Sequence, residues 1–200
     1  MMEPSSSVRF FETQFQQQVQ QADLALNPFE QIALSYIHGR VLDYGCGMGN
    51  LAVAAAQRGC SVVALDASPT AIEHIRRIAR DQALPIEAAE VDLRSHELSE
   101  EFDSIVSIGL LMFFDCATAY RQLHHLQSHL RPGGVAVINV LVEGTTYLDM
   151  FDPKEHCLFA RGDMQAHFPN WEILHFEPQD FAAPKEQVKS FVTLVARKPD

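Results

Sequence analysis

The stretch that decides the fold is VLDYGCGMGN, residues 41–50. Its first part predicts a short strand over 40–43, and its second part is a glycine-rich loop over 45–49. The alanine-rich segment 50–57 that follows predicts a helix, which Gly59 ends. A glycine-rich turn between a strand and a helix directs backbone N–H groups at a negatively charged ligand. We therefore expect an α/β domain with a ligand site at this loop.

The alternation of strand and helix continues along the chain. Further strands are predicted over 61–65, 85–91, 102–108 and 135–142. Helices are predicted from Ser68, an N-cap followed by Pro69, to 82, and over 115–130, where Arg131-Pro132-Gly133-Gly134 breaks the pattern. Strands that alternate with helices of this length predict crossover connections and a parallel sheet.

The two ends of the chain differ from this middle part. Aromatic residues at helical spacing over 8–26 predict an amphipathic helix on the core, with a lid over a ligand as the alternative; a second helix is expected from Pro28 to Gly39. Residues 143–170 read as irregular, with a short helix over 162–168. Strands are then expected over 171–176 and 188–196, and without a helix between them they must be antiparallel. The fold class is thus a Rossmann-like α/β domain: seven strands, mostly parallel with an antiparallel last strand, and helices on both faces.

Composition excludes several classes of function. The formal net charge is −11 and no basic run occurs, which disfavours binding to nucleic acid. No window has the length and apolarity of a membrane span, and residues 1–7 have no features of a secretory signal. The four cysteines form no CxxC pair, so we expect reduced thiols in a cytoplasmic protein, and no metal site.

The spacing of the loop glycines indicates the kind of ligand. A dinucleotide fingerprint has its third glycine at the position of Asn50, whereas here that glycine is Gly49, giving GxGxG. This tighter loop suits a ligand with an uncharged linker and a carboxylate tail rather than a pyrophosphate. Asp66, at the end of a strand, is placed to accept both hydroxyls of a ribose; a solvated aspartate or a helix cap is the alternative.

Two further aspartates follow strands. Asp92 is placed to accept the amino group of an adenine, with Leu93 packing on the ring, although a simple turn residue remains the alternative. Asp43 lies close to the core and needs a partner. That partner is either the ammonium of a bound methionine moiety or the N–H groups of the loop itself.

These residues resemble the class I S-adenosylmethionine-dependent methyltransferases. The matching segments are VLDYGCGMGN at 41–50, VVALDAS at 62–68, EVDL at 90–93, FDSIVSIGLLMFF at 102–114 and LRPGGVAVINV at 130–140. The resemblance implies S-adenosylmethionine as the cofactor and methyl transfer to a small molecule as the activity. It also divides the single domain into an N-terminal helical cover (1–39), a cofactor-binding core (40–142), and an acceptor-side loop with a terminal β-hairpin (143–200).

The resemblance assigns cofactor-binding residues position by position. The methionine part would be surrounded by Asp43, Gly45, Cys46, Gly47 and Gly49, together with Ser107, Ile108 and Gly109. Asp66 and the adjacent Ala67 would contact the ribose, and Asp92 with Leu93 the adenine.

A narrower likeness is to the tellurite-resistance methyltransferases (TehB-type). It is carried by SIGLLMFF at 107–114, CLFARGDM at 157–164, NWEILHF at 170–176 and SFVTLVARKP at 190–199. That group has a Leu-His-Arg segment between its last two strands, where this chain has PQDFAAPKEQ at 178–187. The acceptor can therefore differ, with a metalloid oxyanion or another soft nucleophile as one candidate.

Methyl transfer from a sulfonium needs mainly alignment of the nucleophile, and a general base only if the acceptor arrives protonated. The candidates for that base are Tyr147, Asp149 and His156, in the loop after the fifth parallel strand. Cys157 and Met112 are candidates for contact with a soft acceptor, with packing as the alternative.

The competing functions are a nicotinamide-dependent oxidoreductase and a non-catalytic, S-adenosylmethionine-binding regulatory protein. We expect a monomer or a homodimer whose partner is a small molecule.

Overall fold

The computed structural model describes residues 9, 11–16, 25–152 and 155–200. Of the helix expected over 8–26, residues 11–16 are helical, whereas Phe10, Val19 and Leu24 lie outside the described residues.

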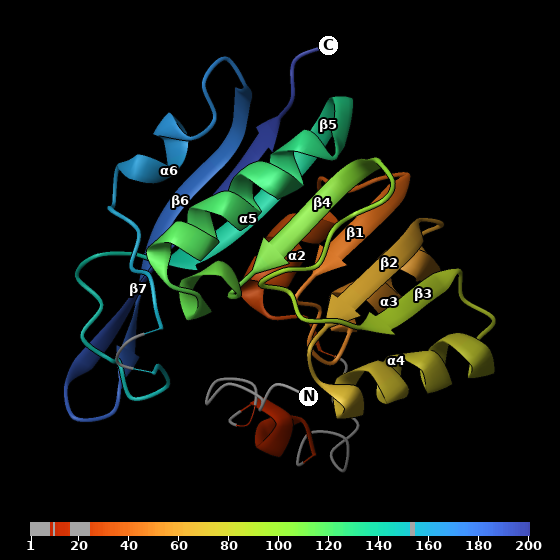
Figure 1. The fold of residues 1–200 in the computed structure, drawn as a ribbon, viewed down its shortest axis with the longest axis horizontal. Coiled ribbons are helices and arrows are strands. Elements are labelled where there is room, and N and C mark those ends of the chain that lie inside the picture. Colours follow the sequence, from red (N-terminus) through yellow and green to blue (C-terminus); the bar gives the residue numbers. More distant parts are fainter. Residues whose placement is uncertain (1–8, 10, 17–24, 153–154) are drawn as a thin grey trace.

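A seven-stranded sheet with the strand order β3-β2-β1-β4-β5-β7-β6 forms the centre of the molecule (Figure 1). The strands are β1 (Arg40–Tyr44), β2 (Ser61–Asp66), β3 (Ile86–Glu90), β4 (Phe102–Ile108), β5 (Leu130–Leu141), β6 (Glu172–Ala183) and β7 (Gln187–Arg197). Strands β1 to β5 pair in parallel, and β7 is antiparallel to both of its neighbours. The fold class predicted from the sequence is confirmed.

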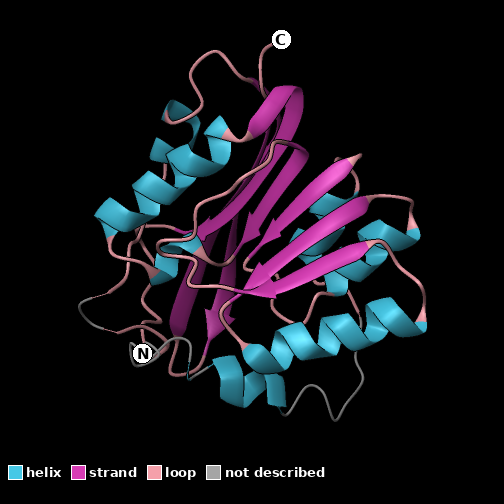
Figure 2. Ribbon diagram, turned by 45° about the vertical axis from the view of Figure 1, so that its right-hand side comes forward, coloured by secondary structure: helices cyan, strands magenta, loops and turns pink. Residues whose placement is uncertain are grey.

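Helices cover both faces of this sheet, as Figure 2 shows. One face packs against α2 (Pro28–Leu34), α3 (Asn50–Gln57) and α4 (Pro69–Asp81). The other packs against α5 (Cys116–Ser128) and α6 (Asp163–Ala166). Because the central strands are covered on both sides, β4 and β5 are apolar over most of their length, with buried Ile105, Val106, Val137 and Ile138.

The strand order reverses between β1 and β4. From β1 the chain winds outward through β2 to β3 in one direction, and from β4 through β5 in the other. The loops after β1 and β4 therefore diverge at the carboxyl ends of these strands, which leaves a crevice where open α/β sheets bind ligands.

Two element boundaries differ from those expected. The helix from Pro28 ends at Leu34 and not at Gly39, because Ser35 caps it and the chain then turns into β1. The segment Arg131–Gly134 does not interrupt the structure but belongs to β5, since Gly133 donates its N–H to the Lys198 carbonyl and Gly134 accepts from the Lys198 N–H.

The terminal hairpin is longer than the sequence indicates. Strand β5 pairs with β7 only from Val135 opposite Arg197 to Leu141 opposite Phe191. Beyond this point residues 187–190 of β7 pair with β6 alone, down to Ala183 opposite Gln187. We call this two-stranded extension, residues 179–190, the hairpin arm; Figure 1 shows it in blue, projecting past the other strands. Within the described part of the chain, no helix has the length and apolar character needed to cross a membrane.

Candidate active site

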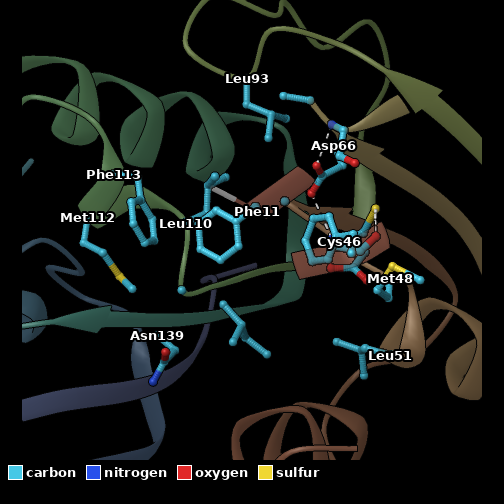
Figure 3. A pocket seen from close by; sticks show the side chains of 18 of the residues that line it. Phe11, Cys46, Met48, Leu51, Asp66, Leu93, Leu110, Met112, Phe113 and Asn139 are labelled. Carbon is cyan, nitrogen blue, oxygen red and sulfur yellow. Dashed lines mark hydrogen bonds between the residues drawn. The ribbon is translucent and has the colours of Figure 1, made fainter. Parts of the chain in front are cut away.

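A cavity of about 850 Å³ opens at the point where the strand order reverses (Figure 3). Its residues come from the glycine loop, the ends of β2 and β3, the segment after β4, the helical residues 11–16, and the hairpin arm. Of the predicted cofactor residues, those that line it are Asp43, Gly45, Cys46, Gly47, Asp66, Ala67, Asp92, Leu93, Ile108 and Gly109. The glycine loop and the acidic strand ends, expected to converge on one slot, therefore do share one cavity.

The glycine loop is held by its own backbone. Gly45 and Cys46 donate their N–H groups to the Leu65 carbonyl, at 2.8 and 3.0 Å, which ties the loop to the end of β2. Gly45 has φ +82°, and a Cβ there would lie 2.9 Å from the Leu110 side chain. Gly49 has φ +77°, and a Cβ there would lie 2.4 Å from Ile75. Only glycine fits these two positions, so the GxGxG spacing is set by packing on both sides of the loop.

Asp66 organises the loop from the tip of β2. Its carboxylate accepts hydrogen bonds from the Gly47 N–H and the Ser68 N–H, both at 2.9 Å. Burial raises the pKa of this carboxyl, while the backbone hydrogen bonds oppose that shift. A half-buried carboxylate that faces the cavity with remaining lone pairs is able to accept ligand hydroxyls.

Asp43 is the buried acid of the site. It is 5% exposed, and its Oδ2 atom has no hydrogen-bond partner. Burial raises the pKa of Asp43 to about 8, and the negative charges of Glu30 and Asp66 contribute to the shift. Burial also raises the pKa of Glu30, whose carboxylate accepts from the Asn27 N–H at the start of α2. Asp43 and Glu30 both line the cavity, and their negative charges repel each other. A cation bound beside them, such as the ammonium of a ligand, would relieve this repulsion.

The adenine end is arranged differently from expectation. Asp92 lines the cavity, but its two oxygens bind the Arg94 guanidinium at 2.9 and 3.0 Å, which lowers the pKa of Asp92. An adenine amino group would have to share this carboxylate with Arg94. Leu93 is buried beside it. Ser107 and Gly49 are not among the cavity-lining residues; Ser107 is fully buried inside β4.

The helical residues 11–16 lie over the glycine loop. The Glu12 carboxylate accepts hydrogen bonds from the Ser68 and Thr70 hydroxyls. Phe15 approaches Gly47, and Phe11 packs edge-on against Phe113 with ring centroids 5.0 Å apart. Both phenylalanines line the cavity, so these residues form part of its wall, and their role as a lid stays a prediction.

The opposite end of the cavity contains residues that the sequence analysis did not select: Phe29, Met150, Asn139, Lys189 and Phe191. They come from α2, the loop after β5, β5 itself and β7. A polar residue inside the apolar segment AVINVLV, 136–142, was the available signal for Asn139, because a buried amide requires partners. We call this part of the cavity the acceptor end.

The three candidates for a general base do not line the cavity. The Tyr147 ring lies under the Lys189 ammonium, 4.5 Å from its centroid. Asp149 is exposed and 3.9 Å from the Lys185 ammonium. His156 stacks on Phe151, and its Nδ1 is 3.2 Å from the Asp152 carbonyl. Their role in catalysis stays a prediction.

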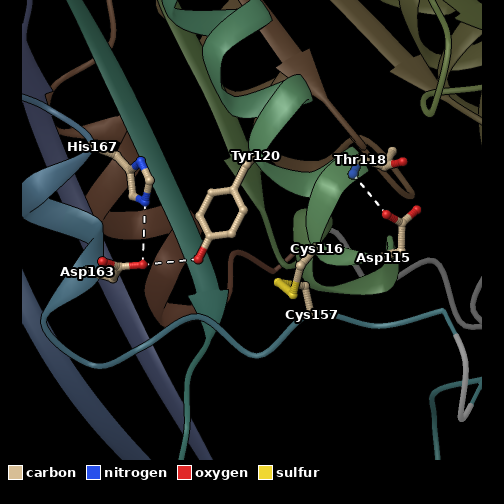
Figure 4. The surroundings of a disulfide bond; sticks show 7 residues. All are labelled: Asp115, Cys116, Thr118, Tyr120, Cys157, Asp163 and His167. Carbon is tan, nitrogen blue, oxygen red and sulfur yellow. Dashed lines mark hydrogen bonds and ion pairs between the residues drawn. A yellow bond between two sulfur atoms is a disulfide. The ribbon is translucent and has the colours of Figure 1, made fainter.

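The cysteines depart from the expectation of four reduced thiols. Cys116, at the start of α5, and Cys157, in the acceptor-side loop, form a disulfide bond (Figure 4). Cys157 also donates its N–H to the Met112 carbonyl, which fixes the loop to the segment after β4. Cys157 is therefore not a free thiol for a soft acceptor, whereas Met112 does line the cavity. Cys46 and Cys60 are free.

The comparisons with known proteins agree with this geometry. Residues 41–134 match the family of methyltransferase domains. The resemblance to class I S-adenosylmethionine-dependent methyltransferases, and to the TehB-type group among them, is confirmed.

Two curated relatives cover most of the chain. Hemagglutinin 1 of Eikenella corrodens is 29% identical over 80% of this chain and 55% of its own length. The "Probable S-adenosyl-L-methionine-dependent methyltransferase TehB" of Haemophilus influenzae is 25% identical over 80% of this chain and 57% of its own length. The chain thus spans little more than half the length of these relatives.

Solved structures show the same fold. The crystal structure of TehB from Haemophilus influenzae has a TM-score of 0.75 at 21% identity, covering 96% of this chain and 67% of that one. The N-methyltransferase NodS from Bradyrhizobium japonicum, in complex with S-adenosyl-L-homocysteine, has a TM-score of 0.73 at 18% identity, covering 98% and 100%.

Proposed function

We propose that this protein binds S-adenosylmethionine and transfers its methyl group to a small molecule. The observation that carries the proposal is the buried Asp43 carboxyl, whose Oδ2 atom has no hydrogen-bond partner and which lies beside the glycine loop in the cavity that Asp66 also lines. When bound, S-adenosylmethionine supplies a methyl group already activated by the sulfonium. The residues that line the cavity fit it: Asp43 and Glu30 would hold its ammonium, Asp66 its ribose, and Leu93 its adenine.

The protein's part in the reaction is to orient and to exclude water. The loop 45–49 fixes the cofactor end, because its backbone is tied to Leu65 and to Asp66. Phe11, Phe15 and Phe113 place apolar surface over the cavity, which keeps water from the reacting atoms. Alignment of a nucleophile in a closed site supplies much of the rate acceleration in a transfer of this kind.

Equilibrium dialysis with S-adenosylmethionine and with a nicotinamide dinucleotide tests the first half of the proposal. We expect binding of the former alone; tight binding of the dinucleotide would favour an oxidoreductase. Transfer of a labelled methyl group to a panel of amines, phenols, thiols and metalloid oxyanions tests the second half. Binding without transfer to any acceptor would favour a regulatory protein.

The similarity to TehB supports a second candidate, methylation of a metalloid oxyanion or another soft nucleophile. Met112, whose thioether lies at the acceptor end, is compatible with such an acceptor. We further propose a monomer or homodimer that acts in the cytoplasm and does not bind nucleic acid, in accordance with the acidic composition.

A further inference from the structure

We propose that the acceptor is an amine with an apolar body and an anionic group at its far end, and that Asn139 and Lys189 recognise its two ends. This inference rests on the proposed function and names the class of acceptor. It is carried by two polar side chains at the acceptor end whose interactions are incomplete within the described residues.

Asn139 supplies a fixed hydrogen-bond acceptor. Its side chain is 1% exposed, and its amide nitrogen donates to the Thr193 hydroxyl at 3.0 Å and faces the Val192 carbonyl at 3.5 Å. A carbonyl can only accept, so the nitrogen must point toward β7 and the oxygen away from it. That oxygen, Oδ1, has no partner, and Asn139 lines the cavity (Figure 3). A buried amide oxygen without a hydrogen-bond donor destabilises the protein. An incoming N–H or O–H group that donates to this oxygen would remove that penalty.

The position of Asn139 places this oxygen at the reacting end. Asn139 lies opposite Ile108 in the pairing of β4 with β5, and its carbonyl accepts the Gly109 N–H at 3.0 Å. Ile108 and Gly109 line the cavity, and the next residue, Leu110, lies against the glycine loop, since a Cβ at Gly45 would be 2.9 Å from its side chain. A nucleophile held by Asn139 is therefore next to the cofactor end.

Lys189 supplies the cation at the other end. The basic side chains that line the cavity, among the residues the structure describes, are Arg94 and Lys189. Arg94 is bound by Asp92, whereas Lys189 forms no ion pair with a described carboxylate, and its ammonium lies over the Tyr147 ring. A cation that faces a cavity without a carboxylate partner favours an anionic group on the ligand.

The strand register sets the length of the acceptor. Thr193, Phe191 and Lys189 alternate along β7 and so share one face of the sheet with Asn139, which lies opposite Thr193. Thr193 and Lys189 are separated by roughly 13 Å at 3.3 Å per residue. Between them the cavity wall is aromatic: Phe191 packs against Phe29 with ring centroids 4.9 Å apart. An acceptor about as long as a substituted benzene ring, together with the side chains of Asn139 and Lys189, can span this distance.

The nature of Asn139 favours nitrogen over oxygen as the nucleophile. An amide oxygen orients an N–H group but does not remove its proton. An alkylamine, an ammonium ion near pH 7, first releases one proton to water, and its neutral form then reacts without a base, whereas a hydroxyl needs one. The nitrogen lone pair forms the bond to the methyl carbon as the carbon–sulfur bond breaks and its electron pair stays on sulfur; the resulting ammonium then releases its proton to water.

Calorimetry on the protein saturated with S-adenosylhomocysteine tests the anionic end. The probes are para-(aminomethyl)benzoate, para-(aminoethyl)benzoate and their methyl esters. We expect at least one acid to bind at least tenfold more tightly than its ester. Lys189→Met should remove that preference, Lys189→Arg should keep most of it, and Lys185→Met, on the same hairpin but outside the cavity, should leave it unchanged. If neither acid binds, or Lys189→Met weakens acid and ester equally, the inference is wrong.

Transfer of a labelled methyl group tests the amine end. Asn139→Leu should lower kcat for the better amine at least tenfold with little change in KM, and Thr193→Val, which loosens the amide, should lower kcat less. Methylation of para-(hydroxymethyl)benzoate or tellurite in preference to the amines overturns this inference while the proposed function stands. Failure to bind S-adenosylhomocysteine overturns both.

Discussion

The two ends of the cavity are built in different ways. The cofactor end is built on short sequence patterns, the loop 45–49 and the tips of β2 and β3, each of which contributes its functional residues within a few positions of the chain. The acceptor end combines α2, the middle of β5, the loop at 143–158 and the hairpin arm. Cofactor recognition is therefore fixed by local backbone geometry, and acceptor recognition by the packing of distant elements, which a change in any one of them can alter.

The largest expected effect is at the cofactor end. Asp66→Ala should weaken binding of S-adenosylmethionine by about 3 kcal/mol, roughly 100-fold, because charged hydrogen bonds are lost and the Gly47 and Ser68 N–H groups lose their acceptor. Asp66→Asn should have a smaller effect, since one acceptor oxygen remains. Calorimetry measures both, with Asp81→Ala, exposed at the end of α4, as the control. An unchanged affinity in Asp66→Ala would remove this residue from the site.

This difference also explains what the sequence could predict. The strand that ends at Asp66 and the spacing of Gly45, Gly47 and Gly49 are local patterns, so the position of the cofactor end could be predicted from them. Asn139 is marked only by its polarity within an apolar strand, and Lys189 by no local pattern: Asn139 meets β7 through the register of β5 with β7, and Lys189 is positioned by the register of β7 with β6. The disulfide likewise joins residues whose proximity depends on the tertiary packing of α5 against the acceptor-side loop.

The second prediction concerns proton exchange at Asp43. With a pKa of about 8, the free protein retains this proton at pH 7, and an ammonium that binds there should displace it. Affinity for S-adenosylmethionine should therefore rise between pH 6 and pH 8, by up to roughly tenfold per pH unit. Calorimetry in buffers of different ionisation enthalpy should detect the released proton. In Asp43→Asn neither the release nor this rise should occur; if both persist, another group carries the proton.

The same shift has a consequence for stability. Between the ordinary value of 3.8 and about 8, folded Asp43 holds its proton while the unfolded chain has lost it. The free energy of unfolding of the free protein should therefore fall as pH rises through this window, and level off above it. Denaturant titrations of the wild type and Asp43→Asn across this range measure the difference. A wild-type stability that rises with pH through the window, relative to the variant, would contradict the assignment.

The third prediction separates backbone strain from packing in the glycine loop. Gly45→Ala should lower the free energy of unfolding by about 2 kcal/mol or more, because it combines a positive φ with a Cβ 2.9 Å from Leu110, and it should weaken cofactor binding several-fold. Gly59→Ala is a matched control, since Gly59 has φ +93° with nothing within 4 Å of an added Cβ. Gly59→Ala should lower the free energy of unfolding through backbone strain alone, and it should leave the affinity for the cofactor unchanged. Equal losses in the two variants would show that contact with Leu110 contributes nothing.

The smallest effect on the cofactor is expected from the disulfide, which belongs to the other end. In a reducing compartment the Cys116–Cys157 disulfide would be opened by thiol exchange, and the segment 143–158 would lose its covalent link to α5, while the hydrogen bond from Cys157 to Met112 would remain. Reduction should therefore increase hydrogen exchange in this segment, which includes the cavity residue Met150, and change the affinity for S-adenosylmethionine less than twofold. Mass spectrometry of exchange with and without dithiothreitol measures this, and the double variant Cys116→Ser, Cys157→Ser should be insensitive to the reductant. If reduction instead weakened cofactor binding more than twofold while it increased exchange in the segment, the two ends of the cavity would be mechanically coupled. Cofactor recognition and acceptor recognition would then not be independent.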